Sequence, residues 1–164
     1  MSIRYFAFVF CLAGFGFSHA QTQEDFDDAG KRILSMVTDS AVTQIVHYIR
    51  KPQYFELVDR QPISDYQKTL LKEKLNDDYS KDHSVMENAL AGLRASYAIE
   101  RKEGATFEYY ETLNEPLRNS TDTYAVKTNY IYRNGKVQTI VSFEYELAWL
   151  GDHFALISEI RESF

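Results

Sequence analysis

The sequence predicts an α+β fold in which about three N-terminal helices pack on a four-stranded antiparallel meander. Apolar residues recur every three or four positions up to about residue 100, and then at every second position after Gly104. Two short turn signals, Asn134-Gly135 and Gly151-Asp152, divide the second part into hairpins. Helices and antiparallel strands that are segregated along the chain in this way are typical of α+β domains.

Residues 1–20 are expected to be absent from that fold, because they have the parts of a cleavable secretory signal peptide. Arg4 supplies the positive charge, residues 5–17 form an apolar run, and the small residues Ser18 and Ala20 flank a cleavage point. The predicted organisation is a signal peptide at 1–20 and a single α+β domain at 21–164, exported to the periplasm or secreted. No later stretch approaches the roughly 18 consecutive apolar residues of a transmembrane helix, so no membrane span is predicted.

Composition narrows the class of partner. Cys11 is the only cysteine and lies in the signal, so the remaining 144 residues form no disulfide and rely on their core, as suits a bacterial periplasm. Arg4 is the only charged residue of the signal, which leaves 17 basic and 24 acidic side chains and a formal charge of −7. This balance disfavours nucleic acid, since phosphate binding needs clustered Lys and Arg, and it agrees with a basic protein partner.

Three helices are expected in the first part of the chain. One amphipathic stripe runs over residues 25–50 and ends at Pro52, while the polar run 38–40 leaves open a division into two shorter helices, because its side chains compete for backbone hydrogen bonds. Two capping boxes, Ser64 with Gln67 and Ser84 with Glu87, predict the starts of the other two helices.

The strands follow from alternation and from the turns. Residues 105–113 predict a first strand, and Asn134-Gly135 predicts a type I′ turn between the next two. The resulting register pairs Tyr132 with Val137 and Tyr130 with Thr139 across the first turn, and Trp149 with Phe154, Leu147 with Leu156, Tyr145 with Ser158 and Phe143 with Ile160 across the second. Both turns place the aromatic residues on one face, so two independent signals agree on which side is the core.

That aromatic face has two interpretations. It is the buried face of the sheet, packed on the helices, since aromatic residues are favoured in strands and fill cores. Alternatively, its many hydroxyl groups need partners, and a partly wet cavity that binds a small apolar molecule supplies them. The candidate pocket residues are Tyr124, Thr128, Tyr130, Tyr145, Trp149, Phe154 and Ser158.

The sequence shows no catalytic or metal-binding pattern, and no cofactor is predicted. It contains no G-x-S-x-G motif, and its isolated glycines exclude a phosphate-binding loop. His47, His83 and His153 fall in three different elements without metal-ligand spacing, so we interpret them as structural or surface residues. The acidic run that begins at Asn76 fits an EF-hand poorly, because Lys81 stands where the loop needs glycine.

The element order suggests a family. Helices are followed by TFEYYETL at 106–113 and by YAVKTNYIYRNGKVQTIVSFEYELAWLGDHFALISEI at 124–160. Over about residues 85–160 this order, with its closing strand pair, resembles the small exported cystatin-like or nuclear-transport-factor-2-like domains of bacterial periplasms. The resemblance implies a curved sheet wrapped around helices to form a cone-shaped pocket, in which some relatives use an Asp or His for isomerisation or dehydration. The expected inward face of these hairpins carries neither residue.

Three functions follow as hypotheses. The leading one is a non-catalytic exported domain that binds a small apolar molecule or a protein partner. The alternative is an acidic interaction or inhibitor protein of the periplasmic immunity type, which neutralises a basic partner. The third is an isomerase or hydrolase of the same fold, with Tyr130, Tyr145 and Glu111 as the acid/base candidates.

Overall fold

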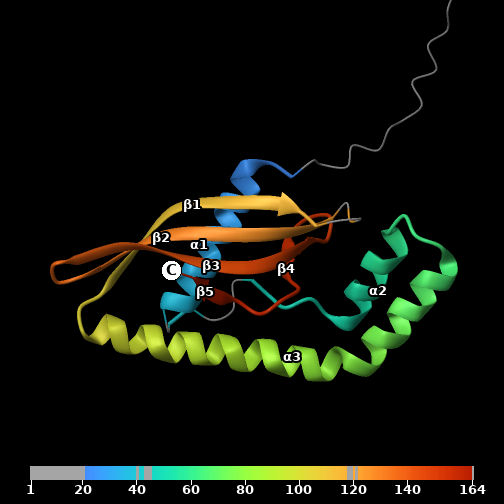
Figure 1. Cartoon of the computed structure of the whole chain (residues 1–164), viewed down its shortest axis with the longest axis horizontal. Helices are drawn as coiled ribbons and strands as arrows, with labels where there is room; N and C mark the ends of the chain where they lie inside the picture. The colour runs from blue at the N-terminus through green and yellow to red at the C-terminus, as the bar shows by residue number, and fades with distance from the viewer. Residues whose placement is uncertain (1–20, 40, 43–45, 118–119, 121, 164) are drawn as a thin grey trace, which may run out of the picture.

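The structure is a computed structural model that describes residues 21–39, 41–42, 46–117, 120 and 122–163. The expected signal peptide at 1–20 lies outside the described residues. The described chain has three helices followed by an antiparallel sheet, which confirms the predicted α+β class (Figure 1).

Helix α1 (Gln23–Thr38) is shorter than the expected helix over 25–50. A capping box between Thr22 and Asp25 starts it, and the Thr38 hydroxyl, at its last residue, donates to the Leu34 carbonyl at 2.8 Å. Beyond residue 38 the single-helix prediction is wrong. Residues 46–50 are not helical, and Tyr48 forms a parallel bridge with Leu156 of the last hairpin. The local apolar spacing fits a helix. The segment pairs with a distant strand instead, because this pairing buries Val46, Tyr48 and Ile49.

Helix α2 (Lys51–Arg60) begins at the point where the sequence predicts that Pro52 ends a helix. Proline lies in the first turn of this helix and begins it, where a missing N–H costs nothing because the first amides have no intrahelical partner. The Arg50 amide donates to Gln53 Oε1 at 2.9 Å, which is one half of a capping box. Our expectation that Pro52 closes the preceding helix was wrong for this reason.

Helix α3 (Asp65–Lys102) runs for 38 residues and combines the last two predicted helices. The Ser64–Gln67 capping box starts it, as predicted, because the Ser64 side chain accepts from the Gln67 amide. The second predicted start, at Ser84, is wrong, since the helix continues through that residue. No glycine or proline lies between residues 65 and 91, so nothing in this stretch forces an end, and a Ser-x-x-Glu spacing inside a helix is then only a surface pair.

The sheet is an antiparallel meander whose last strand is split. Its order is β1 (Thr106–Pro116), β2 (Thr123–Asn134), β3 (Val137–Trp149) and β4 (Phe154–Leu156), while β5 (Arg161–Ser163) also pairs with β3. A β-bulge at Tyr110 interrupts the pairing of β1 with β2.

The register of the first hairpin differs from the prediction by two residues. Asn134 pairs with Val137, so Gly135 and Lys136 are the central turn residues, and Tyr130 lies opposite Val141 rather than Thr139. Gly135 has φ +57°, as the first central position of type I′ and II′ turns requires. A shift of two preserves the faces of the sheet, because side chains alternate with a period of two.

The second hairpin follows the prediction only near its turn. Trp149 pairs with Phe154 and Leu147 with Leu156, as expected. The strand then breaks, and Phe143 lies opposite Glu162 instead of Ile160. Ile160 is buried in the main core instead. The break in the strand therefore lets this side chain reach the core, while the backbone pairing with β3 is interrupted there.

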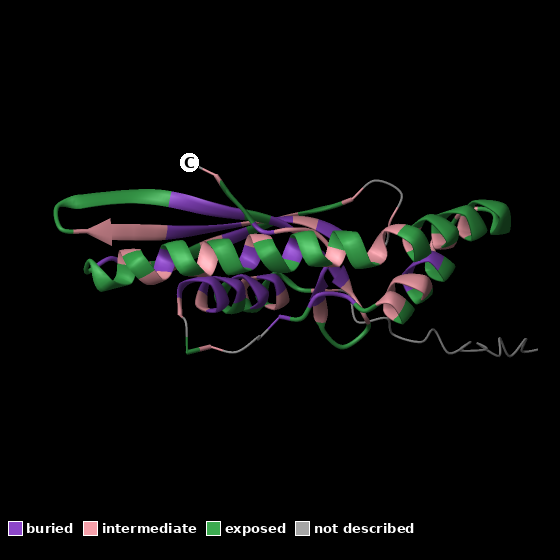
Figure 2. Cartoon of the chain, turned by 90° about the horizontal axis from the view of Figure 1, so that it is seen from below, coloured by how far each residue is buried: buried purple, intermediate pink, exposed green. Residues whose placement is uncertain are grey.

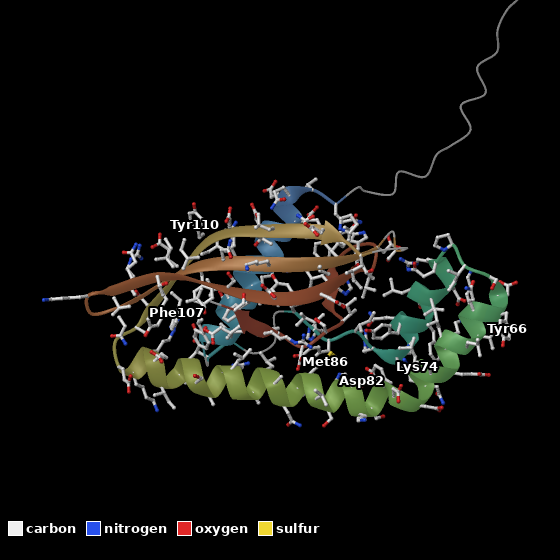
Figure 3. The ribbon with its side chains drawn as sticks, in the orientation of Figure 1. Tyr66, Lys74, Asp82, Met86, Phe107 and Tyr110 are labelled. Carbon is white, nitrogen blue, oxygen red and sulfur yellow. The ribbon has the colours of Figure 1, made fainter. Side chains whose placement is uncertain are left out.

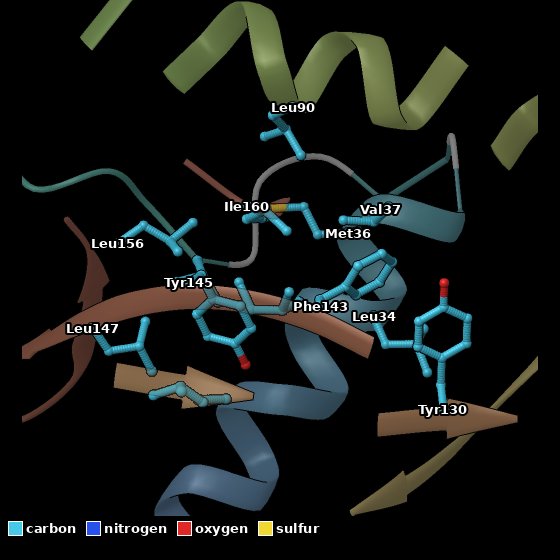
Figure 4. Close-up of a cluster of buried hydrophobic side chains, with 14 of the residues drawn as sticks. Leu34, Met36, Val37, Leu90, Tyr130, Phe143, Tyr145, Leu147, Leu156 and Ile160 are labelled. Carbon is cyan, nitrogen blue, oxygen red and sulfur yellow. The ribbon is translucent and has the colours of Figure 1, made fainter. Parts of the chain in front are cut away.

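One face of the sheet is covered by α1 and by the C-terminal half of α3, and the core lies between them. Figure 4 shows side chains of the strands, α1 and α3 meeting there, and Figure 2 shows that burial is concentrated in this layer. Tyr130, Phe143 and Leu147 are fully buried, at 0% exposure each. Full burial of such side chains contributes about 1.5–3 kcal/mol apiece, so this layer dominates stability.

The N-terminal half of α3 extends beyond the sheet together with α2, and we call residues 51–85 the helical arm. No residue between 65 and 85 is buried, and Met86 is the first of α3 that reaches the core. Figure 3 shows Tyr66 at the far end of the arm, where its side chain is 73% exposed.

Candidate functional site

Most of the predicted pocket residues lie at the junction of the sheet and its helices, but Ser158 lines a hollow on the other face of the sheet and accepts a hydrogen bond from the Glu146 amide at 2.8 Å. Tyr124, Thr128, Tyr130 and Tyr145 are buried on the helix-covered face, while Trp149, Phe154 and Ser158 are half-buried near the last hairpin. Rings pack closely there, with 4.7 Å between the centroids of Tyr130 and Phe143. In Figure 4 both rings belong to the cluster that fills this layer.

The hydroxyl groups of this face are used within the protein. Thr128 Oγ1 and the Tyr145 hydroxyl are 2.7 Å apart, and Thr128 also approaches Thr112 Oγ1 at 3.3 Å. The Tyr124 hydroxyl donates to Gln21 Oε1 at 2.6 Å. Among the described residues, every buried side-chain nitrogen and oxygen has a hydrogen-bond partner. The excess of phenols that suggested a wet cavity is thus matched by partners that distant segments provide.

The side-chain carboxylate of Glu162, in β5, completes the network. Glu162 Oε1 accepts from the Tyr130 hydroxyl at 3.2 Å and from the Tyr97 hydroxyl, and the two phenols also contact each other. Burial, and then the carboxylate beside them, raises the pKa of both phenols. These bonds attach β5 to α3 and β2, and the alternation of residues 157–163 gave no signal for them.

The three acid/base candidates do not converge. Tyr130 and Tyr145 are buried on the helix-covered face, whereas Glu111 Oε1 accepts from Asn129 Nδ2 at 2.8 Å on the opposite face. Ser142 donates to the other side of the Asn129 amide at 2.6 Å. Glu111 therefore takes part in a cross-strand ladder of polar side chains, with the sheet between it and the two phenols.

A groove of about 440 Å³ lies on the face of the sheet opposite the helices, and we call it the outer groove. It is lined by Leu113, Asn114, Glu115, Ala125, Val126, Lys127, Glu144, Tyr145, Glu146, Ser158, Glu159 and Arg161. In the strand register Ala125 lies between Glu115 and Glu146. Its methyl side chain fills little space between two long neighbours, which explains why the sheet is hollow here.

The charges of the outer groove are unevenly paired. Lys127 Nζ lies 3.1 Å from Glu144 Oε1, and Arg161 pairs with Glu159. The Ser163 hydroxyl and then Lys127 lower the pKa of Glu144.

Two carboxylates of the groove remain outside these pairs. Within the described residues, neither Glu115 nor Glu146 has an ion-pair partner. Glu146 acts on Tyr54, whose pKa is raised to about 12 by burial first and by this carboxylate second. The groove thus presents two unneutralised carboxylates on either side of Ala125, an arrangement that suits a cationic side chain.

A second hollow of about 410 Å³ lies along the helical arm. Its apolar lining comes from α2 and α3 and consists of Tyr54, Leu57, Val58, Leu71 and Leu75. The apolar spacing of Tyr66, Leu70, Leu71 and Leu75 predicts that this helix face points inward. The structure leaves Leu70 and Leu71 more than two-fifths exposed, although α2 packs against α3.

No group of three or more His, Cys, Asp or Glu residues in the described part of the chain is arranged to hold a metal ion. The described helices include none with the length and apolarity to cross a membrane. No protein-family model matches the chain, and no curated protein or solved structure shows a significant match to it. The resemblance to cystatin-like and nuclear-transport-factor-2-like domains therefore stays a prediction from element order.

Proposed function

We propose that this protein is an exported, non-catalytic binding domain whose outer groove holds a basic segment of a protein partner. The observation that carries the proposal is the pair Glu115 and Glu146, which flank Ala125 in the groove without an ion-pair partner among the described residues. An Arg or Lys side chain from a partner fits between them and restores the missing positive charge.

The two faces of the sheet support a protein partner over a small apolar one. On the helix-covered face the buried members of the predicted pocket pack against the core, and their hydroxyl groups are hydrogen-bonded within the protein. On the opposite face the groove is open, and its lining comes from β1, β2, β3 and the segment after β4 and includes four carboxylates and two cations. A segment of a partner chain suits this shape, and complementary charge raises both its association rate and its specificity.

Export remains part of the proposal because of the sequence of residues 1–20. The formal charge of −7 on the rest of the chain extends the same attraction over the whole surface, beyond the groove itself. The test must therefore separate the groove from the general field of an acidic protein.

Fluorescence anisotropy with a short labelled arginine-rich peptide makes that separation. The double variant Glu115→Gln/Glu146→Gln is compared with Glu73→Gln/Asp77→Gln, which removes the same charge from the exposed surface of the arm. We expect the groove variant to bind the peptide about tenfold more weakly, as the loss of about 1.4 kcal/mol corresponds to. The arm variant should change the affinity by less than about twofold, because its charges contact no bound segment.

Two further controls vary the salt concentration and reverse the charge of the peptide. Affinity should fall between about 50 mM and about 300 mM salt, since exposed ion pairs are screened, and a glutamate-rich peptide of equal length should not bind. Equal losses in the groove and arm variants would reduce the effect to net charge and would contradict the proposal. Absence of binding at the lower salt concentration would contradict it as well.

A further inference from the structure

Three histidines that are far apart in the sequence line one hollow in the structure. A pocket of about 430 Å³ lies at the first turn of α2 and is lined by His47, Tyr48, Arg50, Gln53, His83, Glu87, His153 and Ala155. The segment before α2 runs between β4 and α3, which brings the three parts of the chain together (Figure 1). We call this hollow the histidine pocket.

Hydrogen-bond donors outnumber acceptors in this pocket. Neither the Arg50 guanidinium nor the His47 ring has an ion-pair partner within the described residues, and both side chains are exposed. The Gln53 carbonyl oxygen is bonded to the Arg50 amide, so the amide N–H group is what this side chain offers the pocket. Glu87 is the one carboxylate of the lining, and it lies 3.5 Å from His83.

Tyr48 stays a neutral hydroxyl at this site. Burial first, and then the charges of Glu87 and Glu159, raise its pKa to about 12. Its hydroxyl donates to the Met86 carbonyl at 2.9 Å, which attaches the pocket floor to α3. Glu159 is itself paired with Arg161, so the main negative charge facing Tyr48 in the pocket is Glu87.

The remaining charges around the histidines come from α1 and from the turn after β3. Asp152 contacts the His153 ring, and a smaller hollow that shares His47 and His153 is also lined by Asp25, Asp28 and Arg32. Over the two hollows, five cations face four carboxylates when all three imidazoles are protonated, and two cations face four when they are neutral. The local charge is therefore positive only when the imidazoles are protonated.

We propose that the histidine pocket binds a small anion that carries a sulfate, phosphate or carboxylate group, and that it does so in mildly acidic conditions. Arg50, His47 and the Gln53 amide supply charge-assisted and neutral N–H donors, and His83 and His153 of the same lining add positive charge when they are protonated. Anion binding favours the protonated imidazoles, so affinity is highest at low pH and is lost as the imidazoles become neutral.

The test is a titration of the purified protein with sodium sulfate, whose charge is constant over the range used. The ring NMR signals of His47, His83 and His153 report the site at about pH 5.5 and about pH 8. We expect saturable shifts at the lower pH and at least about tenfold weaker binding at the higher one. Inorganic phosphate and acetate, titrated separately, show which anion group the pocket prefers.

The test variants replace exposed side chains, so they should not disturb folding. Arg50→Gln and His47→Gln should each weaken sulfate binding about fivefold or more, whereas Lys136→Gln, at the far tip of the first hairpin, should leave it unchanged. Sulfate that shifts none of the three rings at the lower pH would overturn the proposal. So would equal weakening by all three variants, or a response of the rings to Zn²⁺ alone, which would indicate a metal site.

Discussion

Gly30 of α1 lies so close to Thr112 of β1 that a Cβ atom built on the glycine would stand 2.1 Å from Thr112 Oγ1. The same Cβ would be 2.7 Å from Thr128 Oγ1, so side chains of both β1 and β2 lie close to the helix backbone at this residue. Both threonine hydroxyls are held in the buried network with Tyr109 and Tyr145. The contact sets how closely α1 approaches the sheet.

Replacement of Gly30 by alanine should therefore destabilise the protein. Helix propensity alone favours alanine by about 1 kcal/mol, but the clash with two fixed hydroxyls should outweigh it and leave a net loss of about 1–3 kcal/mol. Gly92→Ala is the matched control, because nothing lies within 4 Å of its Cβ position on α3, and it should stabilise by about 0.5–1 kcal/mol. Urea unfolding measures both. Stabilisation of similar size by both variants would show that the helix and sheet are not in this contact.

The turn at Gly135 supports a second prediction, about backbone strain. Its φ of +57° lies in the left-handed region, and no atom lies within 4 Å of a Cβ built there, so any cost of substitution comes from the backbone. Gly135→Val should lower the free energy of unfolding by about 1–3 kcal/mol, while Gly135→Asn should cost less, because asparagine tolerates this region.

Gly92→Val is the control for the valine substitution, since Gly92 lies inside α3 and carries no such requirement. The urea midpoints of Gly135→Asn and of Gly92→Val should both be higher than the urea midpoint of Gly135→Val. Identical midpoints would contradict the turn and with it the observed register.

Two tyrosines, Tyr48 in the core and the half-buried Tyr54, predict loss of stability at alkaline pH. The pKa of Tyr48 and that of Tyr54 are raised to about 12, chiefly by burial, against about 10 in an unfolded chain. A phenol with a raised folded pKa contributes its full stability below about pH 10 and loses it as the pH rises through about 12. The urea midpoint should therefore fall steeply between about pH 10 and about pH 12.

Tyrosinate absorbance checks the same prediction by another route. At about pH 11 the native protein should show only part of the absorbance of the urea-unfolded protein, because the buried phenols stay neutral. Full ionisation of the native protein at that pH, with an unchanged urea midpoint, would show that these side chains are accessible to water.

The comparison of sequence and structure is clearest in the strands. Alternation and the glycine turns predicted the meander and the face to which Tyr130, Phe143 and Tyr145 belong, and the structure confirms both. The first register was wrong by two residues because a sequence with one glycine at a turn does not show which neighbour shares the turn with it. The faces survived that error, since a shift of two keeps every side chain on its side.

The helices show where local signals stop being sufficient. The Ser64 capping box was correct and the Ser84 box was not, although both have the same spacing, because a capping box acts only where the chain before it leaves the helix. Residues 46–50 follow a helical pattern but form no helix, since Leu156 offers them a backbone partner that is more than 100 residues away in the chain.

The sequence by itself determined that helices precede strands, which side chains share a face of each long strand, and the excess of negative charge, because these depend on residue types and on a period that neighbouring residues share. It did not predict α2, and it divided α3 into two helices. Only the tertiary structure decided which polar groups meet. Glu115 and Glu146 flank Ala125 through strand register, Glu162 reaches Tyr97 and Tyr130 from the C-terminal strand, and three dispersed histidines line one pocket. Such contacts join residues tens of positions apart, and their free energy depends on distances that only the packed chain defines.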